Sequence, residues 1–309
     1  MGEWLVGAYG PDMEGTAVGI TRLRSRADGS LEPVDGFLIE APSPAFLASR
    51  DGRLYAALEG EGTILVDGER LSSGGIWPCH IGLYGHDVVI ANYFDGRLAL
   101  LSGQVVEPEP GSGPHPKQDA PHAHATALVA PGVLLKADLG ADRVDVLSLV
   151  DGVLTPMSSL ALPAGTGPRD LLVNQGVVYV LGEHGRTITI VEWTGDALRV
   201  LDTVALPGAL PADGAASLAL GGGYLYTALR GSNQIAVLTV SADGRVLEGV
   251  TSISSAGNWP RHIVLDGAVL HVANQLSNGV ASFSIGAGGI PTLIAEPTFV
   301  ASPTYLLAD

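Results

Sequence analysis

Three stretches of the chain share one pattern: Gly75-Ile76-Trp77-Pro78-Cys79-His80-Ile81, Gly257-Asn258-Trp259-Pro260-Arg261-His262-Ile263 and Gly165-Thr166-Gly167-Pro168-Arg169-Asp170-Leu171. Each is a Gly/Pro turn that opens an apolar run, and weaker copies occur elsewhere. The residue after each turn defines an anchor, and the seven anchors are Ala45, Cys79, His124, Arg169, Ala215, Arg261 and Thr304. Successive anchors are 34, 45, 45, 46, 46 and 43 residues apart, a period typical of four-stranded propeller blades.

The segments between the anchors have the pattern of β-strands. From Leu171 to Val191, short runs rich in Val, Ile and Thr alternate with turns that contain Gly. Fourteen residues after each anchor the chain reaches the predicted end of a second strand, and the same count from Thr304 passes the C-terminus and arrives at Tyr9. We therefore predict an all-β fold in which residues 1–309 form a single seven-bladed β-propeller domain. The N- and C-terminal strands share one blade and close the ring.

Composition narrows the class of protein. Of 309 residues, 46% are hydrophobic and 16% are charged, which suits a packed core and excludes a disordered chain. A net charge of −16 argues against nucleic acid or an anionic membrane as a partner. The single cysteine, Cys79, excludes an internal disulfide and a CxxC metal site. The sequence lacks the patterns of a signal peptide and of a transmembrane helix, so we expect a cytoplasmic protein.

The repeats bring unusual residues to one face of the predicted ring. If the first strand of each blade is innermost, the anchors and the positions fourteen residues later surround the mouth of a central channel. The polar members of the two sets are His124, Arg169 and Arg261 among the anchors, and Glu59, Asp138, Glu183, Gln275 and, one place beyond Leu229, Arg230. Each arginine by itself fits an ion pair that ties blades together. The convergence of the whole set favours a functional site.

A histidine pair adds to this set. His122 and His124 lie two residues apart in Pro121-His122-Ala123-His124, and therefore on one face of a strand. Such a pair suits two metal ligands, but no acidic cluster accompanies it. We predict neither a metal site nor a cofactor. His122 is grouped with Asp138, Arg230 and Gln275 as a predicted substrate-binding residue.

Further motifs run along the chain in a recognisable order. They include Ser43-Pro44-Ala45-Phe46-Leu47-Ala48, Ile90-Ala91-Asn92-Tyr93, Gly111-Ser112-Gly113-Pro114, Asp138-Leu139-Gly140-Ala141-Asp142-Arg143-Val144, Leu181-Gly182-Glu183 and Val272-Ala273-Asn274-Gln275-Leu276-Ser277-Asn278. In this order the chain resembles the seven-bladed lactonase family, which includes propeller-type 6-phosphogluconolactonases and the fungal 3-carboxy-cis,cis-muconate lactonizing enzyme. The resemblance implies a catalytic His, Arg, Glu and second Arg, which map by motif to His124, Arg169, Glu183 and Arg261. It departs from the family at Asp170, where histidine is common.

The resemblance also implies chemistry on a lactone ring. Arginine is too basic to act as a base, so Arg169 and Arg261 suit anion clamping and oxyanion stabilisation. Two nearby guanidiniums would hold Glu183 ionised, as a base or as an orienting group for His124. The expected reaction is hydrolysis of a sugar lactone such as 6-phosphogluconolactone at the channel mouth, within carbohydrate metabolism. Cyclisation or isomerisation of an unsaturated acid, and a non-catalytic binding scaffold, remain as alternatives. The expected partner is a small anionic or neutral lactone, and the oligomeric state stays open.

Overall fold

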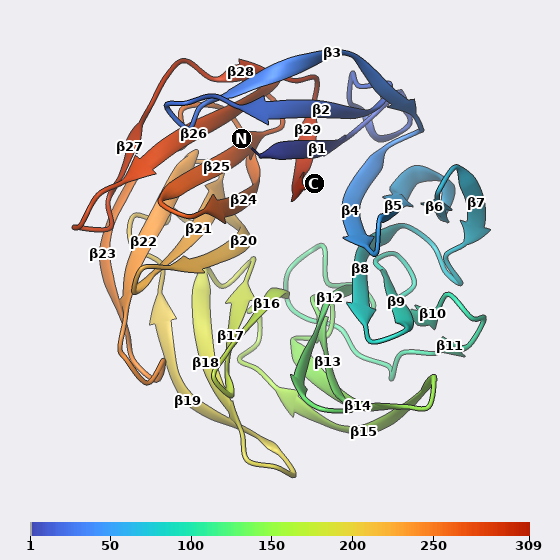
Figure 1. Cartoon of the computed structure of the whole chain (residues 1–309). Helices are drawn as coiled ribbons and strands as arrows, with labels where there is room; N and C mark the ends of the chain where they lie inside the picture. Colours follow the sequence, from blue (N-terminus) through green and yellow to red (C-terminus); the bar gives the residue numbers. More distant parts are fainter. Residues whose placement is uncertain (1) are drawn as a thin grey trace.

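Short apolar runs separated by tight turns form antiparallel sheets throughout the chain. The structure is a computed structural model that describes residues 2–309, without the side chain of Phe37. Across these residues the strands form seven sheets, which stand around a central axis as the blades of a propeller (Figure 1). The predicted all-β, seven-bladed propeller is therefore confirmed. The innermost strands of neighbouring blades contact one another all the way round, so that they line a central channel.

The strands of each blade follow one another from the channel outward. The blade that joins the termini contains β29 (Pro303–Ala308), β1 (Glu3–Ala8), β2 (Gly19–Ser25) and β3 (Leu31–Glu40). The next two contain β4 (Pro44–Arg50), β5 (Arg53–Leu58), β6 (Thr63–Val66) and β7 (Glu69–Ser72), and then β8 (Pro78–Tyr84), β9 (Asp87–Asn92), β10 (Leu98–Leu100) and β11 (Val105–Val106).

Four further blades complete the ring. They contain β12 (Ala123–Ala130), β13 (Val133–Asp138), β14 (Arg143–Val150) and β15 (Val153–Ala161), then β16 (Pro168–Asn174), β17 (Val177–Gly182), β18 (Thr187–Trp193) and β19 (Leu198–Ala205). The last two contain β20 (Gly214–Gly221), β21 (Tyr224–Arg230), β22 (Gln234–Val240) and β23 (Leu247–Ser254), then β24 (Pro260–Asp266), β25 (Val269–Asn274), β26 (Gly279–Ile285), β27 (Pro291–Leu293) and β28 (Thr298–Phe299). Two short 3-10 helices, η1 (Pro11–Met13) and η2 (Glu59–Glu61), lie in the turns that follow β1 and β5.

The two ends of the chain pair within one blade. Strand β29 is antiparallel to β1, with Leu307 opposite Leu5 and Leu306 opposite Val6 (Figure 1). This pairing removes the sheet edges that an open array of blades would expose. The predicted closure of the ring by shared terminal strands is confirmed.

Apolar side chains fill the spaces between neighbouring sheets. Between the β16–β19 and β20–β23 blades, for example, Tyr179 and Leu225 are fully buried in one cluster. The Tyr179 hydroxyl donates a hydrogen bond of 2.8 Å to the carbonyl of Gly244, and Tyr226, its counterpart in the next blade, donates one of 2.9 Å to Gly289. Burial of a large apolar side chain contributes about 1.5–3 kcal/mol. The repeat is therefore a packing unit that cannot bury its faces without its neighbours.

The short first interval of the repeat corresponds to a compact blade. Strands β6 and β7 are joined by Asp67 and Gly68, whose φ angles of 48° and 90° form a tight two-residue turn. Within residues 2–309, we find no helix with the length and apolarity needed to cross a lipid bilayer.

Candidate active site

A β-bulge at the start of the inner strands points the anchor residues into the channel. In β16 the pairing with β17 skips Arg169, because Pro168 lies opposite Gly182 and Asp170 lies opposite Leu181. The same break occurs at Arg261 in β24, and at Ala45, Cys79 and His124 in their own blades. A bulged residue is released from the ladder and re-aimed. The anchors therefore face the axis, although their neighbours in sequence still pair in the sheets.

One anchor lies one residue further along than the repeat predicts. In β20 the break follows Ala215, which is buried in the core between blades, and Ala216 lines the channel in its place. The carbonyl of Ala216 accepts a 2.8 Å hydrogen bond from Nε of Arg169. This one-residue shift explains why Arg230, and not Leu229, is the residue of that blade that corresponds to Glu183 in the blade before it.

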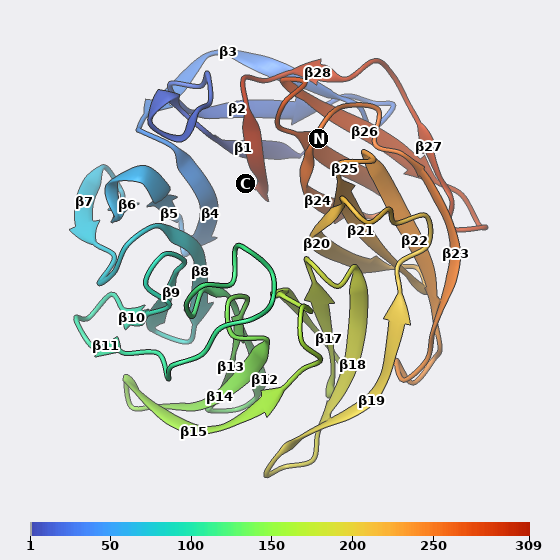
Figure 2. The ribbon, with the colours of Figure 1, turned by 180° about the vertical axis from the view of Figure 1, so that it is seen from behind.

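A cavity of about 440 Å³ opens at the channel mouth, and we call it the mouth cavity. Its lining combines charged, aromatic and apolar side chains: Tyr9, Met13, Glu59, Trp77, Cys79, Tyr93, Phe94, Pro116, Lys117, Asp119, His122, His124, Arg169, Glu183, Arg230 and Arg261. Residues 107–121, the mouth loop, connect β11 to β12 and reach over the centre of the ring (Figure 2). The proposed quartet of His124, Arg169, Glu183 and Arg261 therefore meets in one cavity.

Glu183 is a buried counter-ion for two arginines. Its Oε2 lies 2.6 Å from Nη1 of Arg169, and its Oε1 lies 2.8 Å from Nη2 of Arg230. All three side chains are at most 10% exposed. Burial alone would raise the pKa of Glu183, but the guanidiniums of Arg230 and Arg169 together hold that pKa well below its usual value. With both oxygens engaged, Glu183 is placed to orient the arginines, and it is poorly placed to remove a proton.

His124 is the proton acceptor that the geometry offers. It extends from β12, and its ring is nearly perpendicular to that of Tyr93, at 5.8 Å between ring centroids. Burial, reinforced by the charge of Arg169, holds the pKa of His124 well below the ordinary value of 6.5. At neutral pH the imidazole is therefore uncharged and carries a free lone pair.

Arg261 is held by a second set of contacts on the opposite side of the mouth. Its Nη2 donates to the hydroxyl of Tyr9, and its guanidinium carbon lies 4.5 Å from the centroid of the Tyr9 ring. Tyr9 in turn donates a 2.7 Å hydrogen bond to Oε2 of Glu59, which lies 3.9 Å from the arginine. Burial raises the pKa of Glu59, although Arg261 opposes that shift. Gln275 completes the set, because its Oε1 lies 3.5 Å from Nη1 of Arg261.

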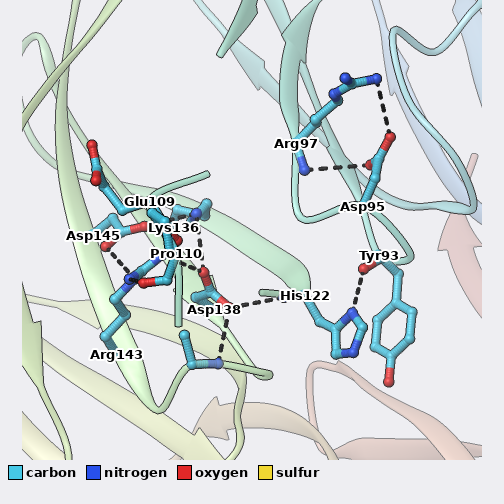
Figure 3. Close-up of polar contacts among 11 residues, drawn as sticks. Tyr93, Asp95, Arg97, Glu109, Pro110, His122, Lys136, Asp138, Arg143 and Asp145 are labelled. Carbon is cyan, nitrogen blue, oxygen red and sulfur yellow. Dashed lines mark hydrogen bonds and ion pairs between the residues drawn. The ribbon is translucent and has the colours of Figure 1, made fainter. Parts of the chain in front are cut away.

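Two predicted substrate-binding residues line the mouth cavity and two do not. His122 and Arg230 line it, and the ring of His122 stacks on Tyr93 at 4.5 Å (Figure 3). Gln275 lies behind Arg261 and outside the lining. Asp138 is also outside: it lies opposite Ala123 within the ladder, whereas Glu183 comes one residue after Gly182, the last ladder partner in its blade. Asp138 and Gln275 contact residues of the protein at this site, and their predicted contact with substrate stays a prediction.

Asp138 belongs to a buried ion network below the mouth loop (Figure 3). Its Oδ1 accepts the backbone N–H of His122 at 2.8 Å, and its Oδ2 lies 3.0 Å from Arg143 and 3.3 Å from Lys136. Arg143 also donates to the carbonyls of Glu109 and Pro110, at 2.5 Å and 3.1 Å. The network thus fixes His122 and the base of the mouth loop together.

A second cavity, of about 230 Å³, continues the channel below the ring of anchors. His80 and His262 line it, and burial lowers their pKa values to about 4 and about 3, so both are neutral. Nδ1 of His262 accepts the N–H of Leu306 at 3.2 Å, and Nδ1 of His80 lies 3.3 Å from the hydroxyl of Thr126. Each of these two imidazoles therefore has a hydrogen-bonding neighbour within the protein.

Some site residues had no predicted role. Tyr9 and Glu59 both occupy the position fourteen residues after an anchor; the sequence placed Glu59 in the polar set without a role and used Tyr9 only to mark the closure of the ring. Trp77 and Trp259 have φ angles of 58° and 63°, an uncommon conformation for bulky residues. Trp77 lines the mouth cavity. Among the residues described by the structure, we find no cluster of three or more His, Cys, Asp or Glu side chains suited to a metal ion.

Fold and cavity together define a seven-bladed propeller with a polar site at one mouth of its channel. The family model "Lactonase, 7-bladed beta-propeller" matches residues 3–307, and the chain belongs to that family. The resemblance seen in the motifs is therefore confirmed.

Individual relatives agree with this membership. The 6-phosphogluconolactonase of Bacillus subtilis strain 168 is 30% identical over 212 residues, which span 61% of this chain and 60% of that protein. Among solved structures, the periplasmic gluconolactonase of Pseudomonas aeruginosa is 25% identical with a TM-score of 0.87, over 99% of this chain and 98% of the other. A protein from Lactobacillus plantarum is 27% identical with a TM-score of 0.88, over 100% and 99% of the two chains.

Proposed function

We propose that this protein hydrolyses a lactone at the mouth cavity. The observation that carries the proposal is the convergence of a neutral, partly buried imidazole with three arginines in one cavity of a lactonase-family propeller. Lactone hydrolysis requires a base for water and positive charge where the carbonyl oxygen becomes an oxyanion. His124 supplies the first, and Arg169 and Arg261 supply the second.

The steps follow from the positions of these groups. His124 takes a proton from a water molecule as the water oxygen bonds to the lactone carbonyl carbon. The carbonyl oxygen gains negative charge, which the guanidiniums of Arg169 and Arg261 stabilise. The tetrahedral intermediate then collapses, the bond to the ring oxygen breaks, and the proton on His124 passes to that oxygen. The products are a carboxylic acid, which loses its proton to solvent, and a hydroxyl on one open chain.

The remaining polar groups prepare the arginines. Glu183 holds Arg169 and Arg230 by one oxygen each, and Tyr9 with Glu59 holds Arg261. Each guanidinium is thereby fixed before substrate arrives. Preorganised charge stabilises an oxyanion without the cost of reorganisation during the reaction.

The wall of the cavity supports a sugar lactone as the substrate class. Trp77 and Phe94 meet edge to face, with 5.2 Å between ring centroids, and both line the cavity opposite the cationic residues. Aromatic faces suit the apolar face of a sugar ring, and the polar groups suit its hydroxyls. The names of the Bacillus and Pseudomonas relatives, a 6-phosphogluconolactonase and a gluconolactonase, point the same way. A cytoplasmic location and a role in carbohydrate metabolism stay predictions.

A lactone panel tests the proposal. Glucono-δ-lactone, 6-phosphoglucono-δ-lactone and a simple aliphatic lactone are followed by acid release, with spontaneous hydrolysis subtracted. We expect wild-type turnover of at least one sugar lactone and a large loss in Arg261→Ala. Arg24→Met should match wild type, because exposed Arg24 lies opposite Glu3, at the end of β1 away from the mouth.

The same assay decides between the alternatives. Consumption of an unsaturated dicarboxylic acid such as a muconate, with no lactone hydrolysis, would replace the proposal by cyclisation. Neither the Bacillus nor the Pseudomonas relative is named as a cyclase. Complete inactivity on every compound, together with stable binding of a protein partner, would favour the binding scaffold.

A further inference from the structure

Two tyrosines, Tyr9 and Tyr93, line the mouth cavity. The hydroxyl of Tyr9 is committed to the protein, because it donates to Glu59 and accepts from Arg261. The hydroxyl of Tyr93 has no hydrogen-bond partner within residues 2–309. Polar groups of a folded protein are nearly always paired, so a free hydroxyl on the wall of a cavity is available to a ligand.

The repeat places Tyr93 level with the charged groups of the site. Tyr93 follows the anchor of its blade by fourteen residues, which is the position that Glu183 and Glu59 occupy in their own blades. All three side chains line the mouth cavity. A molecule held by the arginines is therefore within the same cavity as the free hydroxyl.

The ring of Tyr93 is held in place before any substrate binds. It stacks on His122, with 4.5 Å between ring centroids and 6° between planes (Figure 3). Nδ1 of His122 donates to the carbonyl of Tyr93 at 2.8 Å, and the N–H of Tyr93 donates to the carbonyl of Trp77 at 2.8 Å. Asp138 accepts the N–H of His122 at 2.8 Å, so the buried ion network supports the stack. The hydroxyl is thus preorganised, and little entropy is lost when it meets a substrate.

Tyr93 is also a neighbour of the proposed base. The rings of Tyr93 and His124 are nearly perpendicular, at 87° between planes and 5.8 Å between centroids. A proton transfer between two side chains can run through one bridging water molecule. The two groups are therefore placed to exchange a proton across the cavity.

The acidity of Tyr93 suits a donor to an alkoxide. Burial raises the pKa of Tyr93 to about 12, with Glu183 raising it further and Arg169 opposing the shift, so the hydroxyl keeps its proton at neutral pH. An alkoxide released from a lactone ring is about as basic as hydroxide, whose parent water has a pKa of about 15.7. Transfer of a proton from the phenol to this alkoxide is therefore downhill.

The other candidates near the catalytic groups are committed elsewhere. The arginines are too basic to give up a proton. Glu183 is ionised, and both of its oxygens bind arginines. The proton of Tyr9 is directed at Glu59.

We propose that Tyr93 is a catalytic residue that donates a proton to the ring oxygen of the lactone. This inference rests on the proposed lactone hydrolysis. As the bond from the carbonyl carbon to the ring oxygen breaks, its electron pair goes to that oxygen, which takes the hydroxyl proton of Tyr93. The phenolate then recovers the proton that His124 removed from water, directly or through a water molecule. Both side chains return to their neutral forms, and the proton of His124 reaches the ring oxygen by way of Tyr93.

Two lactones that differ in their leaving group test this role. The ring oxygen of glucono-δ-lactone leaves as an alkoxide and needs a proton, whereas that of dihydrocoumarin leaves as a phenolate, whose pKa of about 10 makes a donor dispensable. We measure kcat and KM on both lactones with wild type and Tyr93→Phe. The variant should lose about 10²–10³ in kcat on glucono-δ-lactone, with KM nearly unchanged, and less than about threefold on dihydrocoumarin.

Two other tyrosines provide matched controls. Tyr9→Phe acts through Arg261 on the oxyanion, so it should affect the two lactones alike. Tyr84→Phe removes a hydroxyl that contacts Thr126, and it should affect neither. The Tm of Tyr93→Phe should match that of wild type, because the hydroxyl has no partner within residues 2–309 and the ring that stacks on His122 is kept.

Several results would overturn the role of Tyr93 while leaving lactone hydrolysis intact. These are an unchanged kcat of Tyr93→Phe on glucono-δ-lactone, equal losses on the two lactones, or a loss carried by KM, which would identify a binding contact. A clearly lower Tm of this variant would identify a structural role and reject the inference as well. If wild type hydrolyses no lactone, the proposed function fails, and the role of Tyr93 fails with it.

Discussion

Replacement of Glu183 by glutamine separates the role of this residue as a counter-ion from a role as a base. Glutamine has nearly the same shape, keeps one acceptor oxygen and replaces the other with an NH₂ donor. Because Arg169 and Arg230 each use one carboxylate oxygen, at 2.6 Å and 2.8 Å, one of them must then face a donor. Neither arginine can turn to water easily, since their side chains are 9% and 7% exposed.

The expected loss of stability is large for a substitution that replaces a single oxygen atom by an NH₂ group. Removal of one partner from a buried ion pair costs about 3–5 kcal/mol, because a charge stays buried without compensation. With an unfolding entropy of about 2.1 cal/mol/K per residue, this chain of 309 residues should lose about 1.5 °C of Tm per kcal/mol. Glu183→Gln should therefore lower the Tm by about 5–8 °C.

A surface copy of the same arrangement provides the control. Glu192 also contacts two arginines, with Arg199 at 2.5 Å and Arg245 on its other oxygen, but these arginines are 61% and 43% exposed. Glu192→Gln should leave the Tm nearly unchanged, because exposed ion pairs contribute little. Differential scanning calorimetry of the two variants and wild type at pH 7 measures the contrast. Equal Tm shifts in the two variants would refute the assignment of Glu183 as a buried counter-ion.

The pH dependence gives a second check on Glu183. The folded-state pKa is lowered well below 4.5, so the carboxylate stabilises the fold above that pH and this contribution is lost as the pH falls through the folded pKa. The stability difference between wild type and Glu183→Gln should be constant from pH 6 to pH 8. It should narrow only below about pH 4.5. A difference that narrows between pH 8 and pH 6 contradicts the lowered pKa.

Three further outcomes are expected from other parts of the site. His124→Asn should lower kcat/KM by about 10²–10⁴. Because burial lowers the pKa of His124, the wild-type rate should not vary with pH above 6.5. A wild-type rate that rises from pH 6.5 to pH 8 speaks against His124 as the base. Tyr9→Phe removes the hydroxyl that faces Arg261 and should lower kcat about tenfold. Tyr84→Phe removes a hydroxyl that contacts Thr126 and should leave kcat unchanged. Equal rates for both variants count against the Tyr9 contact. Arg143→Met should destabilise the fold by about 3–5 kcal/mol and expose the mouth loop to limited proteolysis, and an uncut loop would show that other contacts suffice.

The fold could be predicted because the repeat is written into consecutive residues. Gly/Pro turns such as Trp77-Pro78 and Trp259-Pro260 mark the start of an inner strand, and their spacing counts the blades. The position of Tyr9 in the repeat even predicted that the terminal strands share a blade. Such features are local, because turn chemistry and strand periodicity act between residues close in sequence.

Part of the site could also be predicted, because equivalent positions in a closed ring share one face. This logic placed Arg169, Glu183 and Arg261 at the channel mouth. Asp138 and Gln275 occupy equivalent positions, but their side chains contact His122 and Arg261 and lie outside the lining of the mouth cavity. The repeat fixes a backbone position, but the direction of a side chain depends on neighbours from other blades.

The sequence by itself determined the all-β class, the number of blades and the set of polar residues near the axis, because these depend on short-range pattern and counting. Only the tertiary structure decided that Glu183 is committed to Arg169 and Arg230, that His124 stays neutral, and that the mouth loop brings Lys117 beside Arg230. Burial, charge pairing and the bulges that aim side chains all require residues far apart in the chain to meet. Such meetings exist only once the ring has closed.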